Sequence, residues 1–124
     1  MELKVVSVEP DLIRLAASGR ISRDGWPIGY DPLREACGES VYESNVLLNV
    51  EEAPYVDSTG VEWMLLCHHR FKKAGKAFIM HTLPPTTLQI LRMMRMHLVL
   101  TIADDEERAK AIVCGETNGL QTRQ

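Results

Sequence analysis

This chain has few cysteines, no long apolar run and no excess of positive charge. The cysteines Cys37, Cys67 and Cys114 are odd in number and widely spaced, so a disulfide framework is not expected. No apolar run is long enough to span a bilayer, and the N-terminus lacks the apolar core of a signal peptide. The formal net charge of -3 argues against nucleic-acid binding, which usually requires a basic stripe. We therefore expect a cytoplasmic protein without a membrane span or a nucleic-acid partner.

The sequence also lacks the arrangements that are typical of metal sites and catalytic sites. Cys67, His68 and His69 are adjacent, but neighbouring residues of a helix point about 100° apart and do not close on one ion. Four histidines are available as bases, but the chain has no Gly-x-Ser-x-Gly elbow to present a nucleophilic serine to one of them. Asp57-Ser58-Thr59-Gly60 resembles the Asp-[Ser/Thr]-Gly of aspartic proteases, but it has one extra residue between aspartate and glycine. We therefore expect a protein that is not an enzyme, with no catalytic residue, no metal and no cofactor.

The apolar periodicity predicts one α/β domain over residues 1–114, with elements in the order β-β-α-β-α-β-α-β-α. The first two strands are expected to pair as a hairpin, and the strands separated by helices to pair in parallel through right-handed crossovers. About five strands are predicted at 3–8, 12–21, 46–50, 76–82 and 99–103, and about four helices at 31–43, 60–73, 85–94 and 108–114. Residues 115–124 are polar and are expected to form a flexible tail.

Some packing can be predicted from the same pattern. Residues 76–82 are apolar on both faces and should form a central strand that is covered on two sides. Met93, Met94 and Met96 are expected to fill the core rather than bind a metal. The buried face of the helix at 60–73 is expected to consist of Val61, Met64, Leu65, His68 and Phe71.

The most informative feature is Asp57-Ser58-Thr59-Gly60, a hydroxyl-rich turn between a predicted strand and a predicted helix. The start of a helix leaves backbone N–H groups unpaired and carries a partial positive charge. It is therefore a good place to hold an anion, including a phosphate attached to a serine. A plainer interpretation is that Asp57 or Ser58 only caps the helix.

The order of elements, with this serine turn after the third strand, resembles the STAS domain. Within that family the chain is most similar to bacterial anti-sigma factor antagonists, over about residues 3–114. The matching segments are Ser18-Gly19-Arg20-Ile21 at the end of the hairpin, Val46–Val50 before Val56–Gly60, Ala74-Gly75-Lys76 before the next strand, Leu83-Pro84-Pro85, and Met96-His97-Leu98.

The resemblance implies a switch in bacterial transcription regulation under stress. Ser58 would be phosphorylated by a serine kinase that is also the anti-sigma factor, and the unphosphorylated form would bind this partner and free the sigma factor. A serine phosphatase would restore the form that binds. The phosphoacceptor is then Ser58, and Gly60 is expected to leave room for a partner backbone. The residues expected to contact the partner are Asp57, Thr59, Gly60, Val61, Glu62 and Trp26.

Two features depart from the family pattern. Family members often have a Gly-x-Gly run at the motif, whereas this chain has Gly60-Val61-Glu62, so Glu62 would narrow the approach of a partner or select a different one. The loop 22–31 is longer than usual, and Trp26 and Tyr30 either form an exposed contact patch or Trp26 packs over the sheet edge as a lid. An alternative function is a STAS scaffold with an unmodified Ser58, in a sensory or transporter-associated assembly. The sequence leaves a homo-oligomer open.

Overall fold

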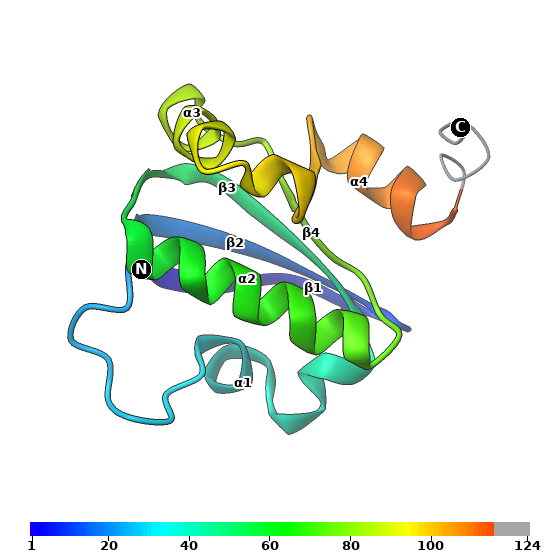
Figure 1. Ribbon diagram of the computed structural model, residues 1–124. Helices are drawn as coiled ribbons and strands as arrows, with labels where there is room; N and C mark the ends of the chain where they lie inside the picture. The colour runs from blue at the N-terminus through cyan, green and yellow to red at the C-terminus, as the bar shows by residue number, and fades with distance from the viewer. Residues whose placement is uncertain (116–124) are drawn as a thin grey trace.

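The computed structural model describes residues 1–115, and its elements follow the predicted order around one sheet (Figure 1). Strands β1 (Glu2–Glu9) and β2 (Leu12–Ile21) form the expected antiparallel hairpin. Strands β3 (Asn45–Val56), β4 (Phe78–His81) and β5 (Thr101–Ala103) follow, each parallel to the strand before it. The strand order is β1-β2-β3-β4-β5, so the predicted mixed sheet of five strands is confirmed.

Helices cover both faces of this sheet (Figure 1). The four α-helices are α1 (Pro32–Cys37), α2 (Ser58–Lys73), α3 (Pro85–Met93) and α4 (Glu106–Val113), and two short 3-10 helices are η1 (Glu39–Glu43) and η2 (Met96–Leu98). The main core joins Leu48 of β3 to residues of α1, α2 and α3, whereas Leu47 packs with Ala109 of α4 in a second, smaller core. Because successive side chains of a strand point to opposite faces, α4 covers the face opposite to α1, α2 and α3.

Strand β4 lies between these two layers, as predicted. Phe78 and Met80 belong to the main core, whereas Ile79 belongs to the core under α4. All four residues of the strand are buried. The continuous apolar run therefore reports a strand that is covered on both faces.

Several predicted boundaries were wrong. Strand β4, expected at 76–82, is shorter at both ends, and β5, expected at 99–103, begins only at Thr101. The helix expected at 31–43 ends at Cys37, because Gly38 has a φ of 93° and a ψ of 174°, a conformation that essentially only glycine adopts. Strand β3 runs six residues past Val50 and pairs with β2 as far as Ile21 and Val56. The sequence did not indicate this extension, because the charged pair Glu51-Glu52 interrupts the apolar pattern. Helix α4 begins at Glu106, two residues early, with Asp105 as its cap.

Two predictions about packing were also wrong. Met93 and Met94 are exposed, and only Met96 packs against the main core. Helix α3 ends at Met93, and Arg95, with a φ of 61°, turns the chain out of the helix. The buried stripe of Thr87 and Leu91 therefore does not continue to Met94, and Met93 lies on another side of the helix. In α2 the buried face is rotated from the predicted one, because Leu65 and His68 are only half-buried. The residues buried in this helix are Gly60, Val61, Trp63, Met64, Cys67 and Phe71.

Within residues 1–115, no helix combines the length and the apolar character that a bilayer span requires. The three cysteines are free. The predicted tail at 115–124 lies outside the described residues, except for Gly115.

Candidate functional site

The motif lies where β3 ends and α2 begins, and Asp57 is the residue that caps the helix. Its backbone is extended, with a φ of -107°, and its Oδ1 accepts hydrogen bonds from the Gly60 N–H at 2.9 Å and the Thr59 hydroxyl at 2.6 Å. Helix α2 therefore begins at Ser58, two residues earlier than predicted. Of the two capping residues that the sequence allowed, the structure selects Asp57.

Ser22 and Arg23 connect the loop 22–31 to this helix start. The Ser22 hydroxyl donates to Asp57 Oδ2 at 2.5 Å, and the Arg23 backbone N–H donates to Thr59 Oγ1 at 2.8 Å. The sequence analysis missed Ser22. No local signal in the sequence indicates it, because Ser22 reaches Asp57 only through the pairing of Ile21 with Val56 at the ends of the parallel strands β2 and β3.

The Asp57 carboxylate is held in its charged form. The hydrogen bonds from the Ser22 hydroxyl, the Thr59 hydroxyl and the Gly60 N–H lower its pKa from 3.8 to about 2. A fixed negative charge therefore occupies the start of α2 at neutral pH, where the helix dipole favours it.

Ser58 differs from both other hydroxyl residues of the site. It is exposed at the first position of α2, and no side-chain hydrogen bond engages its hydroxyl among residues 1–115. The Thr59 hydroxyl, by contrast, donates to Asp57 and accepts from Arg23, and Ser22 is buried. Ser58 is thus the hydroxyl of the motif that an external group can reach without breaking an internal bond.

Gly60 and Val61 are both buried. A Cβ on Gly60 would overlap the carbonyl oxygen of Ile21 and would lie 2.7 Å from its carbon and 2.9 Å from Val56 Cγ2. The room that was expected for a partner backbone is therefore taken up by the end of β2. Val61 is buried in the main core. Their packing fixes the positions of Ser58 and Glu62 at the surface, while neither residue exposes a side chain to solvent.

The aromatic loop packs on α2. Trp26 is half-buried and makes edge-to-face contacts with Trp63 of α2 at 6.1 Å and with Tyr30 at 5.2 Å between ring centroids. Tyr30 and Ile28 are exposed. Neither interpretation of Trp26 was complete, because this side chain anchors the loop while its neighbours remain accessible.

A hollow of about 400 Å³ lies between this loop and the motif. Its lining includes Thr59 and the exposed Glu62, whose carboxylate is 3.7 Å from the Arg23 guanidinium. A serine hydrolase would need a histidine beside the nucleophile. No histidine of the described chain lines this hollow, so the serine–histidine pair of such an enzyme is not formed there. The other residues that line the hollow are Arg23, Trp26, Pro27, Ile28, Gly29 and Tyr30.

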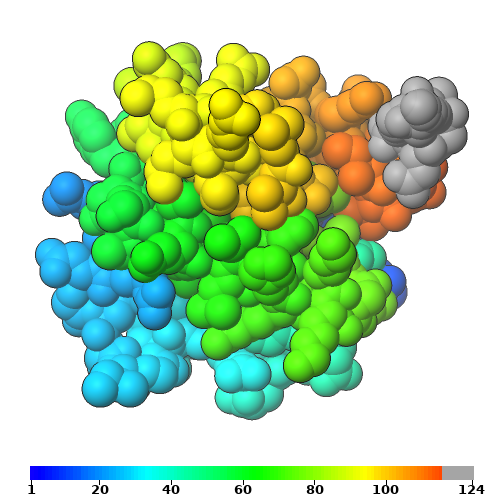
Figure 2. All heavy atoms as spheres, viewed as in Figure 1, coloured from blue at the N-terminus to red at the C-terminus, as the bar shows by residue number. Residues whose placement is uncertain are grey.

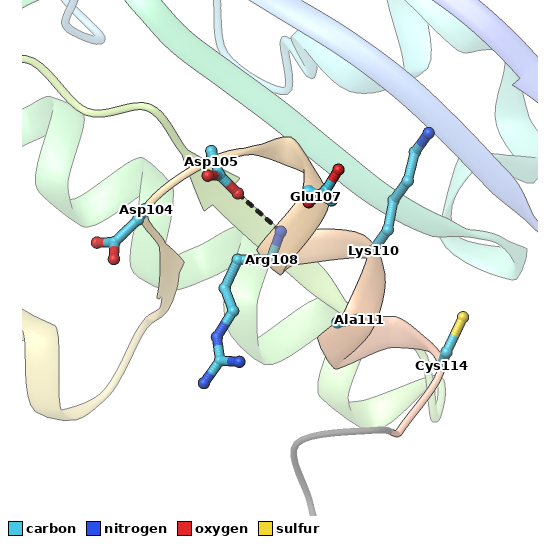
Figure 3. Close-up of a pocket in the computed structure, with 7 residues that line it drawn as sticks. All are labelled: Asp104, Asp105, Glu107, Arg108, Lys110, Ala111 and Cys114. Carbon is cyan, nitrogen blue, oxygen red and sulfur yellow. Dashed lines mark hydrogen bonds between the residues drawn. The ribbon is translucent and has the colours of Figure 1, made fainter.

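A larger hollow of about 570 Å³ lies along α4, away from the motif (Figure 3). Asp105 caps the helix by accepting from the Arg108 N–H at 2.8 Å. The charged side chains of Asp104, Arg108 and Lys110 point in different directions rather than toward a common centre (Figure 3). In the part of the chain that is described, no group of three or more His, Cys, Asp or Glu side chains could hold a metal ion.

Comparison with known proteins agrees with this geometry. The STAS domain family model matches residues 5–109. A candidate anti-sigma factor antagonist from Thermotoga maritima superposes with a TM-score of 0.72 at 12% sequence identity, over 90% of this chain and 92% of the other. An anti-sigma-factor antagonist (STAS) domain protein from Planctomyces limnophilus gives a TM-score of 0.65 at 12% identity, over 92% and 99% of the two chains. A search of curated protein sequences finds no significant match. The predicted resemblance is confirmed, and the chain belongs to the STAS domain family.

Proposed function

We propose that this protein is an anti-sigma factor antagonist that acts by binding, and that phosphorylation of Ser58 controls the binding. The observation that carries the proposal is the free, exposed hydroxyl of Ser58 at the first position of α2. The family and the two structural neighbours, which are described as anti-sigma factor antagonists, supply the class of partner. In this proposal a kinase that is also the anti-sigma factor modifies Ser58, and a phosphatase reverses the modification. We place this cycle in the cytoplasm of a bacterial cell, where it regulates transcription under stress.

The charge of Asp57 explains why a phosphate would act as a switch. A phosphoserine carries between one and two negative charges near neutral pH. At Ser58 it would adjoin a carboxylate that already occupies the Gly60 N–H at the helix start. The phosphate would therefore stay at the surface and would have to be desolvated when a partner covers it. Leaving a charge unpaired in an interface, or facing a like charge, costs several kcal/mol.

The exposed surface around Ser58 indicates how the partner would bind. Glu62 and the loop with Trp26 border the hollow next to the motif. Aromatic residues that are already held in place contribute binding energy at a low entropic cost. We therefore assign partner contact to Ser58, Glu62 and the Trp26 loop. Asp57 and Thr59 hold this surface together through their bonds to the loop.

The first test is intact-protein mass spectrometry of the chain from its native cells, with and without phosphatase, followed by fragmentation. A phosphatase-sensitive mass on Ser58 would support the proposal. In parallel, purified variants serve as bait for an anti-sigma factor from the same cells. Ser58→Ala should retain the partner, and Ser58→Asp should lose it. The control is Ser40→Asp, which adds the same charge at an exposed position of η1. Equal capture by Ser58→Ala and Ser58→Asp would refute the switch.

A second function is a STAS scaffold in which Ser58 is never modified, within a sensory or transporter-associated assembly. The position of Asp57 favours it, because the helix start already holds one anion and a phosphate would add repulsion. The same mass measurement separates the two. No phosphate on Ser58 under several growth and stress conditions would support the scaffold.

A further inference from the structure

A long stretch of this acidic chain carries only positive charge. Residues 63–103 contain no aspartate and no glutamate, although the whole chain has 17 acidic residues and a net charge of -3. The cations of this stretch are Arg70, Lys72, Lys73, Lys76, Arg92 and Arg95. Within the described chain, neither Arg92 nor Arg95 forms an ion pair. Within residues 1–115, these two guanidinium groups therefore have no carboxylate at ion-pair distance.

Large apolar side chains are exposed beside these two arginines. Met93 is 76% exposed, Leu98 72%, Met94 43% and Val99 41%. Single exposed apolar residues are common on protein surfaces. Four of them within seven residues form a patch, and such patches mark interaction sites.

The outer side of α3 is also hollowed. Residues spaced as one helical stripe, including Leu88, Arg92 and Met93, line a hollow of about 500 Å³. A second hollow, of about 250 Å³, shares Leu88 and Arg92 with the first and continues to His97 and to Asp104. The segment that forms these hollows is yellow in Figure 2 and faces the viewer above α2. We call this region, from Pro85 to Val99, the α3 surface.

We infer that the α3 surface binds an acidic amphipathic helix of a partner protein. A helix would lay its apolar side chains into the hollows, and the flexible methionines would adapt to them. Acidic residues on the flanks of that helix would pair with Arg92 and Arg95. An anionic membrane is the weaker fit, because surface recognition of anionic lipids usually takes four to eight clustered cations. This site does not involve Ser58 and goes beyond the proposed switch.

The test uses the whole 124-residue chain with 13C-labelled methionine methyl groups, observed by NMR. The first probe is a synthetic helix with leucines at i, i+3, i+4 and i+7 and glutamates on both flanks. The second probe is the same helix with lysines in place of the glutamates, and the third is vesicles of phosphatidylserine and phosphatidylcholine. We expect the acidic helix to shift the methyl signals of Met93 and Met94. Met64 and Met80 are fully buried and serve as internal controls that should not move.

Charge reversal then tests the two arginines. Arg92→Glu combined with Arg95→Glu should weaken binding of the acidic helix by about tenfold. Lys72→Glu, an exposed change in the same basic stretch, should leave the affinity within about twofold, as should Ser58→Asp. The inference is overturned if millimolar acidic helix moves neither methyl, or if the basic helix binds equally well. It is also overturned if only the vesicles shift Met93 and Met94, which would assign the surface to a membrane.

Discussion

Replacing Gly60 with alanine tests the contact that fixes the motif against the sheet. In an ordinary helix this change stabilises the protein by about 1 kcal/mol, because glycine is the poorer helix former. Gly60 lies in the first turn of α2, where Asp57 accepts its backbone N–H. Helix propensity alone therefore predicts a more stable protein. The packing of this glycine predicts the opposite sign.

The magnitude follows from what the new Cβ would meet. It would overlap the Ile21 carbonyl oxygen and lie 2.7 Å from the carbonyl carbon. Both atoms are backbone, so no side-chain rotation removes the overlap, and the start of α2 has to shift away from β2. Overpacking of this kind costs about 1 to 3 kcal/mol. Because the overlap is with backbone atoms, we take the upper end of this range, about 3 kcal/mol. Less the gain in propensity of about 1 kcal/mol, Gly60→Ala should lower the free energy of unfolding by about 2 kcal/mol.

Urea unfolding followed by tryptophan fluorescence measures this change, because Trp63 is buried in α2. The matched control is Gly25→Ala in the loop, where a Cβ meets no atom within 4 Å but φ is 82°. That variant should lose only about 1 kcal/mol, the cost of a left-handed conformation for an ordinary residue. A Gly60→Ala protein that is as stable as the parent, or more stable, would refute the packing argument.

Three further predictions concern the groups around the core and the motif. Asp31→Ala should destabilise the protein by about 2 kcal/mol, because it removes the α1 cap and the acceptor of the Tyr42 hydroxyl. Chemical denaturation measures this loss, and a value below about 0.5 kcal/mol would contradict the prediction. The lowered pKa of Asp57 contributes stability that is complete above its ordinary pKa of 3.8 and is lost as the pH falls toward about 2. In Asp57→Asn the free energy of unfolding should lack this loss between pH 3.8 and about 2. An acid unfolding profile identical to that of the parent would count against the prediction. A thiol reagent should label the exposed Cys114 in the folded protein and Cys67 only after unfolding, because Cys67 is buried and burial raises its pKa. Mass spectrometry measures the two labelling rates, and equal rates in the folded protein would show the reasoning to be wrong.

The element order could be predicted from the sequence because the signals behind it are local. Strand β2 was predicted with its exact bounds, since alternating apolar residues and the turn before it are neighbours in the chain. The continuous apolar run of β4 indicated correctly that this strand is buried on both faces. The serine turn was found as the motif because a hydroxyl-rich junction between a strand and a helix is visible within a few residues.

The errors arose where partners distant in sequence decide the outcome. The charged residues Glu51 and Glu52 looked like the end of a strand, yet pairing with β2 continues β3 to Val56. Met93 and Met94 were expected in the core because they are apolar. Their exposure follows from where α3 ends and turns away, at Met94 and Arg95, which the apolar pattern does not show.

The candidate site divides in the same way between sequence and tertiary structure. The sequence by itself determined that a serine, an aspartate and a glycine meet at the start of a helix, because these residues are adjacent in the chain. Only the tertiary structure brought Ser22 to Asp57, 35 residues away, and decided that this aspartate caps the helix while Ser58 stays free. It also showed that the Ile21 carbonyl group fills the space where a Cβ on residue 60 would lie, so that only glycine fits there without a shift. The physical reason is that β2 and β3 are parallel neighbours, so the segments leaving their ends meet at one edge of the sheet.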